Sequence, residues 1–89
     1  MESKMTDNEF DVLDELYFLI SFDDLLNQCN LTTDELKSVL ESLLIKRWVK
    51  CFKNTDEEIP EQEVDFKNSF KQYNYLATKS GLFAHNSTS

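Results

Sequence analysis

Residues 20–49, ISFDDLLNQCNLTTDELKSVLESLLIKRWV, decide the fold of this chain. Two apolar patterns with helical spacing lie within it, one at Phe22, Leu25, Leu26 and Cys29 and the other at Leu36, Val39, Leu40 and Leu43. Spacings of three and four residues gather side chains on one face of a helix. We therefore expect two amphipathic helices here, followed by a strand that starts at Trp48.

Local signals mark where these two helices begin and end. Ser21 precedes the first helix with Asp24 three residues later, and Thr32 precedes the second with Glu35 three residues later. A hydroxyl at the N-cap accepts from a backbone amide, and the acid at the third position can reach back to complete a capping box. Asn30 tolerates the left-handed conformation that often ends a helix, so we expect a tight turn and two crossed helices.

A further helix is predicted near the N-terminus, where Thr6 and Glu9 form another capping box. One side of this helix carries the apolar residues Phe10, Leu13, Tyr17 and Ile20. Val12 and Leu16 widen the apolar arc, and two interpretations stay open. Either the helix is clamped between its neighbours, or Val12 and Leu16 contribute to a surface that binds a protein partner.

The C-terminal half predicts two strands and a last helix. The β-formers of residues 48–53 and 72–77 indicate the strands, and Thr78 is expected to cap a helix that ends near His85. Residues 54–71 between the strands are acidic at first and then alternate aromatic residues with lysines, with a short helix after Pro60 as an alternative. The aromatic residues Phe66, Phe70, Tyr73 and Tyr75 either pack this segment onto the domain or stack on nucleic-acid bases.

Residues 25–49 resemble the helix-turn-helix of winged-helix proteins, and YLATKSGL at 75–82 resembles that family's second wing strand running into a final helix. The resemblance implies a mainly α fold with a small antiparallel β-wing. The implied order is helix, a short strand, helix, helix, strand, strand and short helix, in a single domain over residues 1–89. One departure is Arg47, because the family usually places glycine just before the strand. Residues 1–5 and 86–89 are expected to be disordered.

The resemblance also implies a DNA-binding transcriptional regulator of the small bacterial type, in which helix 32–46 reads the major groove and the wing contacts the backbone of double-stranded DNA. The residues expected to contact DNA are Thr33, Lys37, Ser38 and Ser42 on the helix and Lys53, Lys67 and Lys71 on the wing. Such proteins are often dimers, and a homodimer of this chain would have to form through the first helix and the C-terminal segment.

The net charge of −8 opposes DNA binding, because a basic surface normally supplies the affinity for phosphates. Residues 1–24 hold eight of the acids and one lysine, so much of the excess lies away from the expected recognition helix. The alternative is an acidic winged-helix module that binds a protein and not DNA. Its expected contact residues are Val12, Leu16, Asp34, Glu41 and Ile45.

Other functional classes find little support in the sequence. It contains no phosphate-binding glycine loop, no nucleophile paired with a base and no metal-ligand pair, so we expect neither an enzyme nor a cofactor. Cys29 and Cys51 are expected to be structural, and His85 is expected at the surface. No stretch approaches the length of a membrane span, and the acidic N-terminus is unlike a signal peptide, so a cytoplasmic location is the expectation.

Overall fold

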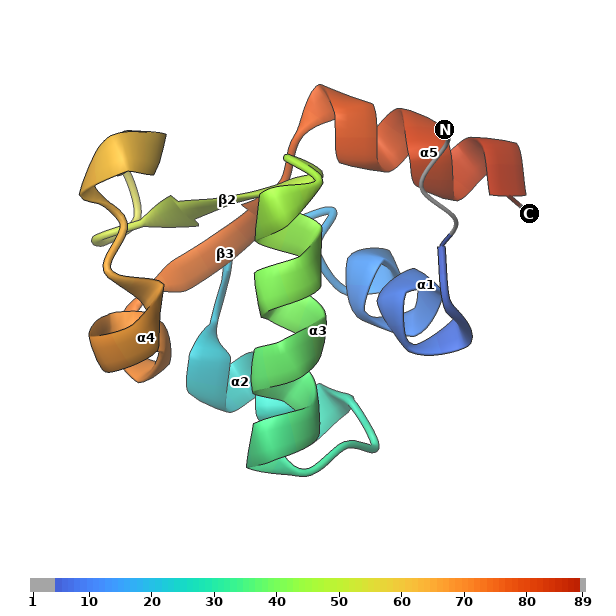
Figure 1. The fold of residues 1–89 in the computed structure, drawn as a ribbon, viewed down its shortest axis with the longest axis horizontal. Coiled ribbons are helices and arrows are strands. Elements are labelled where there is room, and N and C mark those ends of the chain that lie inside the picture. Colours follow the sequence, from blue (N-terminus) through green and yellow to red (C-terminus); the bar gives the residue numbers. More distant parts are fainter. Residues whose placement is uncertain (1–4, 89) are drawn as a thin grey trace.

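The computed structural model describes residues 5–88 and consists of helices around a small antiparallel sheet (Figure 1). The helices are α1 (Asp7–Asp14), α2 (Phe22–Gln28), α3 (Thr33–Ile45), α4 (Phe66–Ser69) and α5 (Lys79–Thr88), and the strands are β1 (Ile20–Ser21), β2 (Val49–Phe52) and β3 (Asn74–Ala77). Two turns of 3-10 helix, η1 (Glu61–Glu63) and η2 (Phe70–Gln72), lie between β2 and β3. The expected mainly helical fold with a small antiparallel sheet is confirmed, and α4 is an addition to it.

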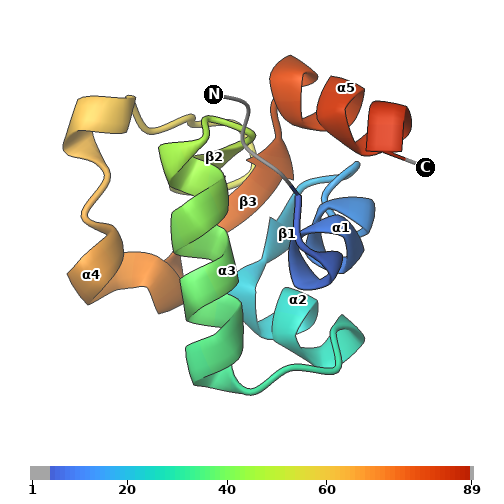
Figure 2. The same ribbon diagram turned by 45° about the vertical axis from the view of Figure 1, so that its right-hand side comes forward.

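The sheet has the strand order β1-β3-β2, with both pairings antiparallel. Val49 faces Ala77 and Phe52 faces Asn74, which confirms the expected pairing between the region after Trp48 and the region around Tyr75. The two residues of β1 pair with β3 where the chain passes from α1 into α2 (Figure 2). The sheet therefore joins the N-terminal helices to the C-terminal half of the chain.

The core lies where α1, α2 and α3 meet the sheet. Its fully buried side chains include Val12, Leu13, Leu16, Phe22, Leu25, Leu36, Leu40, Leu43 and Tyr75. Leu36, Leu40 and Leu43 are each 0% exposed, as the periodicity of α3 predicts. Burying one such side chain stabilises the fold by about 1.5–3 kcal/mol. The apolar face of α3 therefore contributes three fully buried side chains to the core.

The predicted N-caps of α1, α2 and α3 are all present. The hydroxyl of Ser21 accepts a hydrogen bond from the amide of Asp24 at 3.2 Å. Thr32 and Glu35 form a complete capping box with bonds of 3.1 and 2.8 Å, and Thr6 and Glu9 form another with the same lengths. These caps satisfy amides that the first turn of a helix leaves without partners.

The expected extension of α1 to Ile20 is wrong, because the helix ends at Asp14. The amide of Leu16 bonds to the carbonyl of Leu13 at 2.9 Å, and the Leu16 carbonyl accepts from the amide of Ala77. This bond to β3 and the pairing of Ile20 take the chain out of the helix. Val12 and Leu16 are 0% exposed, so the proposal that they form a partner surface is also wrong.

The left-handed residue of the turns is Arg47 and not Asn30. Among residues 5–88, Arg47 is the only non-glycine residue with a positive φ, at 63°. The amide of Arg47 bonds to the Leu44 carbonyl and the amide of Trp48 bonds to the Leu43 carbonyl, both at 3.0 Å. This pair of bonds is the Schellman motif, in which a left-handed residue ends a helix.

The last helix starts as predicted but continues further. The Thr78 hydroxyl accepts from the amide of Gly81 at 3.1 Å and donates to the Arg47 carbonyl at 2.8 Å. A Cβ added to Gly81 would lie 2.1 Å from the Trp48 carbonyl oxygen, so only glycine fits this close approach. α5 extends through Thr88, so the expected end of the helix near His85 is wrong. Residues 1–4 and 89 lie outside the described part of the chain.

His85 is buried, contrary to expectation. Its ring stacks on Phe10 with the centroids 4.1 Å apart, and its Nδ1 lies 2.8 Å from the hydroxyl of Tyr17. Tyr17 also donates to the side-chain carbonyl of Asn86 at 3.1 Å. These contacts join α1 and the turn after it to α5, which is why α5 stays helical beyond His85.

No helix in the described part of the chain has both the length and the apolar composition that crossing a membrane would take.

Candidate functional site

The outward face of α3 is the first part of the candidate site. Its exposed residues are Asp34, Glu35, Ser38, Glu41 and Ile45. Asp34, Ser38, Glu41 and Ile45 are among the residues expected from the sequence to contact a partner, and all four are exposed. Ile45 is 76% exposed, which is unusual for an isoleucine. This face therefore presents acids and one bare apolar side chain, with no exposed lysine or arginine within the helix.

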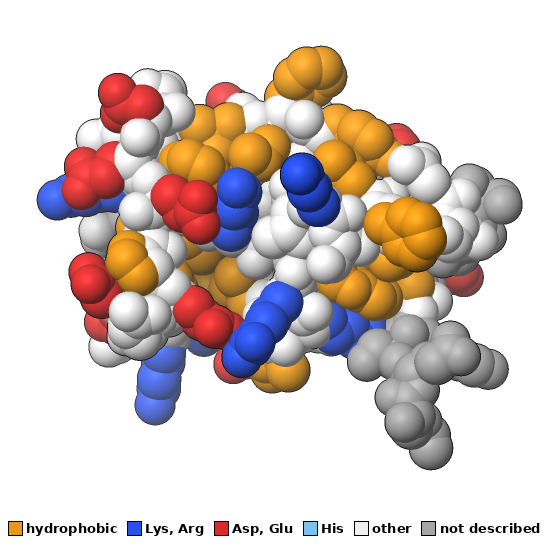
Figure 3. All heavy atoms as spheres, turned by 90° about the horizontal axis from the view of Figure 1, so that it is seen from above, with side chains coloured by type: hydrophobic (Ala, Val, Ile, Leu, Met, Phe, Trp, Pro, Cys, Tyr) orange, Lys and Arg blue, Asp and Glu red, His pale blue; other side chains and the backbone are white. Residues whose placement is uncertain are grey.

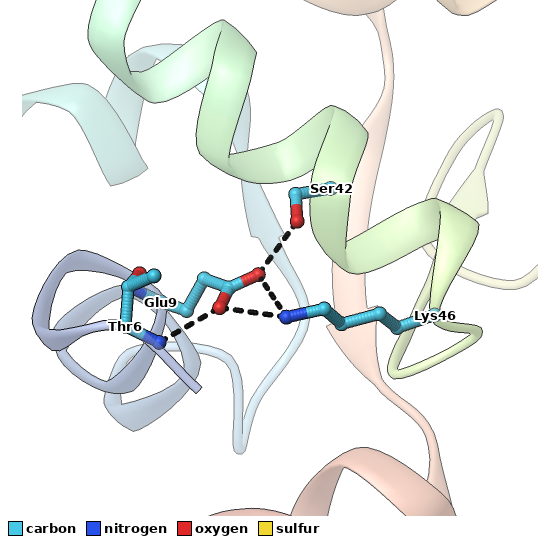
Figure 4. Close-up of polar contacts among 4 residues, drawn as sticks. All are labelled: Thr6, Glu9, Ser42 and Lys46. Atoms are coloured by element: carbon cyan, nitrogen blue, oxygen red, sulfur yellow. Dashed lines mark hydrogen bonds and ion pairs between the residues drawn. The ribbon is translucent and has the colours of Figure 1, made fainter. Parts of the chain in front are cut away.

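Ser42 does not lie on the outward face, so its expected position was wrong. It is half-buried and donates a hydrogen bond of 2.7 Å to Oε2 of Glu9 in α1 (Figure 4). Lys46 donates to both carboxylate oxygens of Glu9 at 2.8 Å, and its Nζ also lies 4.9 Å from the ring centroid of Trp48. Both polar groups at this end of α3 are thus engaged with α1.

Glu9 is the centre of this polar cluster and is only 2% exposed. Burial by itself would raise the pKa of its carboxyl group. The hydrogen bonds from Lys46, from the amide of Thr6 and from Ser42 outweigh burial and hold the pKa below its ordinary value of 4.5. Glu9 therefore stays ionised at neutral pH and acts both as a cap of α1 and as an anchor for α3.

The lysines expected to contact DNA are spread over several elements. Lys37 is half-buried, and its Nζ lies 4.8 Å from the ring centroid of Phe70, which Lys71 also approaches to 5.9 Å. Lys53 follows β2 and Lys67 lies on α4, and both are exposed. The structure thus brings Lys37 and Lys71 together on one aromatic ring. Thr33 is half-buried in the first turn of α3.

The aromatic residues of the β2–β3 connection (residues 53–73) pack on the domain. Phe70 contacts Phe22 at 5.2 Å between ring centroids and Phe66 at 5.6 Å. The hydroxyl of Tyr75 donates to the Phe70 carbonyl at 2.6 Å, and that of Tyr73 accepts from the amide of Asp65 at 2.8 Å. Of the two interpretations of these aromatic residues, the structure supports packing, and Pro60 begins only the short turn η1.

A groove of about 450 Å³ lies between α3 and the β2–β3 connection. We call it the α3 groove. Its lining from the two sides includes Glu41, Leu44 and Ile45 of α3, Val49 and Cys51 of β2, and Ile59, Val64 and Phe66 of the connection. Burial raises the pKa of the Cys51 thiol to about 12, so this thiol is not a nucleophile at neutral pH. The lining is predominantly apolar, with charged residues at its margin.

Two ion pairs lie at the margin of the α3 groove. Arg47 pairs with Glu61 at 3.1 Å, and Lys50 pairs with Glu58 at 3.5 Å. Both cations are therefore matched by an acid of the connection. Glu41, the remaining acid of the lining, has no ion-pair partner among residues 5–88. The groove thus has one carboxylate available for an external cation.

The surface around the groove is acidic. The exposed acids of the connection are Asp56, Glu57, Glu58, Glu61, Glu63 and Asp65. Figure 3 shows acidic side chains at this end of the molecule, with hydrophobic side chains and several Lys and Arg side chains between them. Residues 33–73, from the start of α3 to the end of the connection, hold nine acids and seven bases, which gives this region a net charge of −2. A polyanion approaching it would be repelled.

Parts of this site were not visible in the sequence. The pairing of Glu9 with Lys46 joins residues 37 positions apart, and the groove forms only when the connection folds back beside α3.

In the described part of the chain, no three His, Cys, Asp or Glu side chains are grouped so that they could hold a metal ion. No known protein family, curated protein or solved structure matches this chain.

Proposed function

We propose that this chain is a winged helix-turn-helix protein. The order of its elements, the strand order β1-β3-β2 and the crossing of α2 and α3 seen in Figures 1 and 2 support this class. The exposed face of α3 beside the β2–β3 connection corresponds to the recognition helix and wing of the class. Fold alone does not assign function. The chemistry of this surface therefore has to decide whether its partner is DNA or a protein.

We propose that this surface binds a protein partner. The observation that carries this proposal is the exposed face of α3. Asp34 and Glu41 are exposed on this face, and Ile45 is 76% exposed beside an apolar groove. An exposed apolar side chain next to an apolar groove is typical of a protein interface. The buried position of Val12 and Leu16 limits the proposed contact residues to Asp34, Glu41 and Ile45.

DNA binding is the weaker candidate on the same surface. Affinity for DNA comes largely from cations that neutralise phosphates. Ser42 is hydrogen-bonded to Glu9, and Lys37 lies against Phe70, which removes two of the expected helix contacts from the outward face. Ser38 remains exposed, but Asp34 and Glu41 lie on the same face and would repel the backbone.

A titration of labelled duplex DNA followed by fluorescence anisotropy tests this proposal. We expect no binding of mixed-sequence duplex to the whole chain at about 50 mM salt, where phosphate contacts are strongest. The double variant Asp34→Lys, Glu41→Lys serves as a matched control, because it reverses the charge of exposed positions. If the acids of α3 exclude DNA, this variant should gain weak binding that disappears at about 200 mM salt.

The opposite result for the unmodified chain would overturn the proposal. It would consist of measurable binding at low salt that falls steeply as salt rises. The slope of log affinity against log salt would then decrease by about one for Lys37→Ala, as expected for a lysine that contacts one phosphate.

A further inference from the structure

We propose that the α3 groove binds a basic, amphipathic peptide segment of the partner. An apolar side chain of this segment packs against Ile45 in the groove, and a lysine or arginine of the segment pairs with Glu41. This inference rests on the proposed function and adds to it the chemical class of the partner. Three features of the groove carry it: its apolar lining, its unpaired carboxylate and the charge around it.

The apolar lining requires an apolar group from the partner. Ile45 is 76% exposed, while Leu44, Ile59 and Val64 around the groove are half-buried. These side chains come from α3 and from the β2–β3 connection, so an inserted side chain would touch both sides of the groove. Covering them removes apolar surface from water, which is the main favourable contribution to association. Ile45 is therefore the central contact of the proposed interface.

The unpaired carboxylate of Glu41 indicates that the partner carries a positive charge at this position. Glu41 and Ile45 are four residues apart on α3, so their side chains are neighbours about 5–6 Å apart on one face. Arg47 and Lys50 are already paired with acids of the connection, whereas Glu41 has no ion-pair partner in the described part of the chain. A partner with a lysine or arginine close to an apolar side chain can pair with Glu41 and pack on Ile45 at the same time.

The surrounding charge excludes other occupants. The net charge of −2 over residues 33–73, within a chain of net charge −8, attracts a basic segment and raises its rate of encounter. A second copy of this chain carries a net charge of −8 and would bring acids against acids. Nucleic acids and anionic membranes are disfavoured for the same reason. The basic peptide is therefore the occupant that the groove and its margin fit together.

Selection from a random peptide library displayed on phage tests the inference. The library is selected in parallel on the whole chain, on Ile45→Asp and on the control Phe83→Asp. Phe83 is 75% exposed on α5 and is not part of the groove, so both substitutions place a carboxylate at an equally exposed position. We expect enrichment of peptides that combine lysine or arginine with a bulky apolar residue, on the whole chain and on Phe83→Asp but not on Ile45→Asp.

Synthetic copies of the enriched peptides then give affinities. Ile45→Asp should weaken binding by at least about tenfold, as for a central interface residue, and Phe83→Asp should leave it unchanged. Glu41→Gln should weaken binding by roughly threefold at low salt and have little effect at high salt. Circular dichroism of each variant checks that the fold is retained.

Two other outcomes would overturn the inference in different ways. Peptides that depend on Ile45 but show no bias toward lysine or arginine would refute the basic partner and leave the proposed function standing. No enrichment that depends on Ile45 would refute docking in the groove. Failure of the proposed function itself would be seen separately, as binding of duplex DNA by the unmodified chain.

Discussion

Arg47 shows how a single residue ends the helix that forms the candidate site. Its φ of 63° lies in the left-handed region, where a side chain with a Cβ costs roughly 1–2 kcal/mol. Glycine is the usual residue at this position of a Schellman motif. Arg47 offsets part of this cost by pairing with Glu61, although both side chains are mostly exposed. An exposed pair of this kind contributes only about 0–1 kcal/mol.

Replacing Arg47 by glycine should therefore stabilise the protein. We expect Arg47→Gly to raise the free energy of unfolding by about 0.5–1 kcal/mol, because relief of the left-handed conformation exceeds the loss of the ion pair. Urea denaturation measures this change. Arg47→Ala is the matched control, since it loses the ion pair and keeps the strained conformation, and it should be slightly destabilising. A less stable Arg47→Gly variant would show that Arg47 contributes more through Glu61 than through its backbone.

Glu9 joins two helices, and its role belongs to the scale of elements. The capping box of Thr6 and Glu9 in α1 has the same bond lengths as the box of Thr32 and Glu35 in α3. Glu35 is exposed, whereas the carboxylate of Glu9 also accepts hydrogen bonds from Ser42 and Lys46. The two boxes therefore differ in the burial of the acid and in the contact between α1 and α3.

Truncating both acids separates local capping from helix packing. We expect Glu35→Ala to cost about 1 kcal/mol or less, as for the loss of one capping contact. Glu9→Ala should cost about 3 kcal/mol, because it also removes the mostly buried ion pair with Lys46 and the hydrogen bond from Ser42. Chemical denaturation of the two variants side by side measures the difference. Equal losses would mean that the α1–α3 contact adds nothing to the cap.

The ionisation of Glu9 also predicts a dependence on pH. Because its pKa is lowered in the folded state, the stabilisation it provides is fully present above the ordinary value of 4.5 and is lost as the pH falls through the folded value. The stability difference between the unmodified chain and Glu9→Gln should therefore shrink in acid. Urea denaturation at a series of pH values measures it, and a difference that stays constant into strong acid would contradict the assignment.

At the same scale, local signals predicted some elements well and others poorly. The starts of α1, α2 and α3 follow from caps within three residues of each other, so the sequence contains their full cause. The end of α1 and the strand β1 depend on pairing with β3, more than 50 residues away. The apolar pattern up to Ile20 fits a longer helix, and only the distant strand decides otherwise.

For the whole molecule, the sequence predicted the class of fold and the acidic character but not the shape of the candidate site. The buried face of α3 and the β2–β3 pairing are as expected. The outward positions of Asp34, Glu41 and Ile45 also follow from helical periodicity. The α3 groove could not be predicted, because it depends on how residues 53–73 fold back, and no local pattern specifies that path.

The structure shows where the acidic side chains lie relative to the α3 groove. Glu41 of α3 and acids of the connection lie at the margin of the groove, where two of these acids pair with Arg47 and Lys50. Ser42 and Lys46 are held by Glu9 on the side of α1. The surface that corresponds to a recognition helix and wing under the proposed assignment is thus acidic and has an apolar centre. This combination favours a protein partner with basic and apolar residues.

The most direct test of this account is an NMR titration of the isotope-labelled chain with duplex DNA and, in parallel, with a basic peptide from the selection. We predict that the peptide shifts the backbone amide signals of Glu41, Ile45 and Ile59 and that the duplex shifts none at low salt. Salt-sensitive shifts of Lys37 and Ser38 caused by the duplex, or peptide shifts centred on α5 instead of the α3 groove, would contradict it.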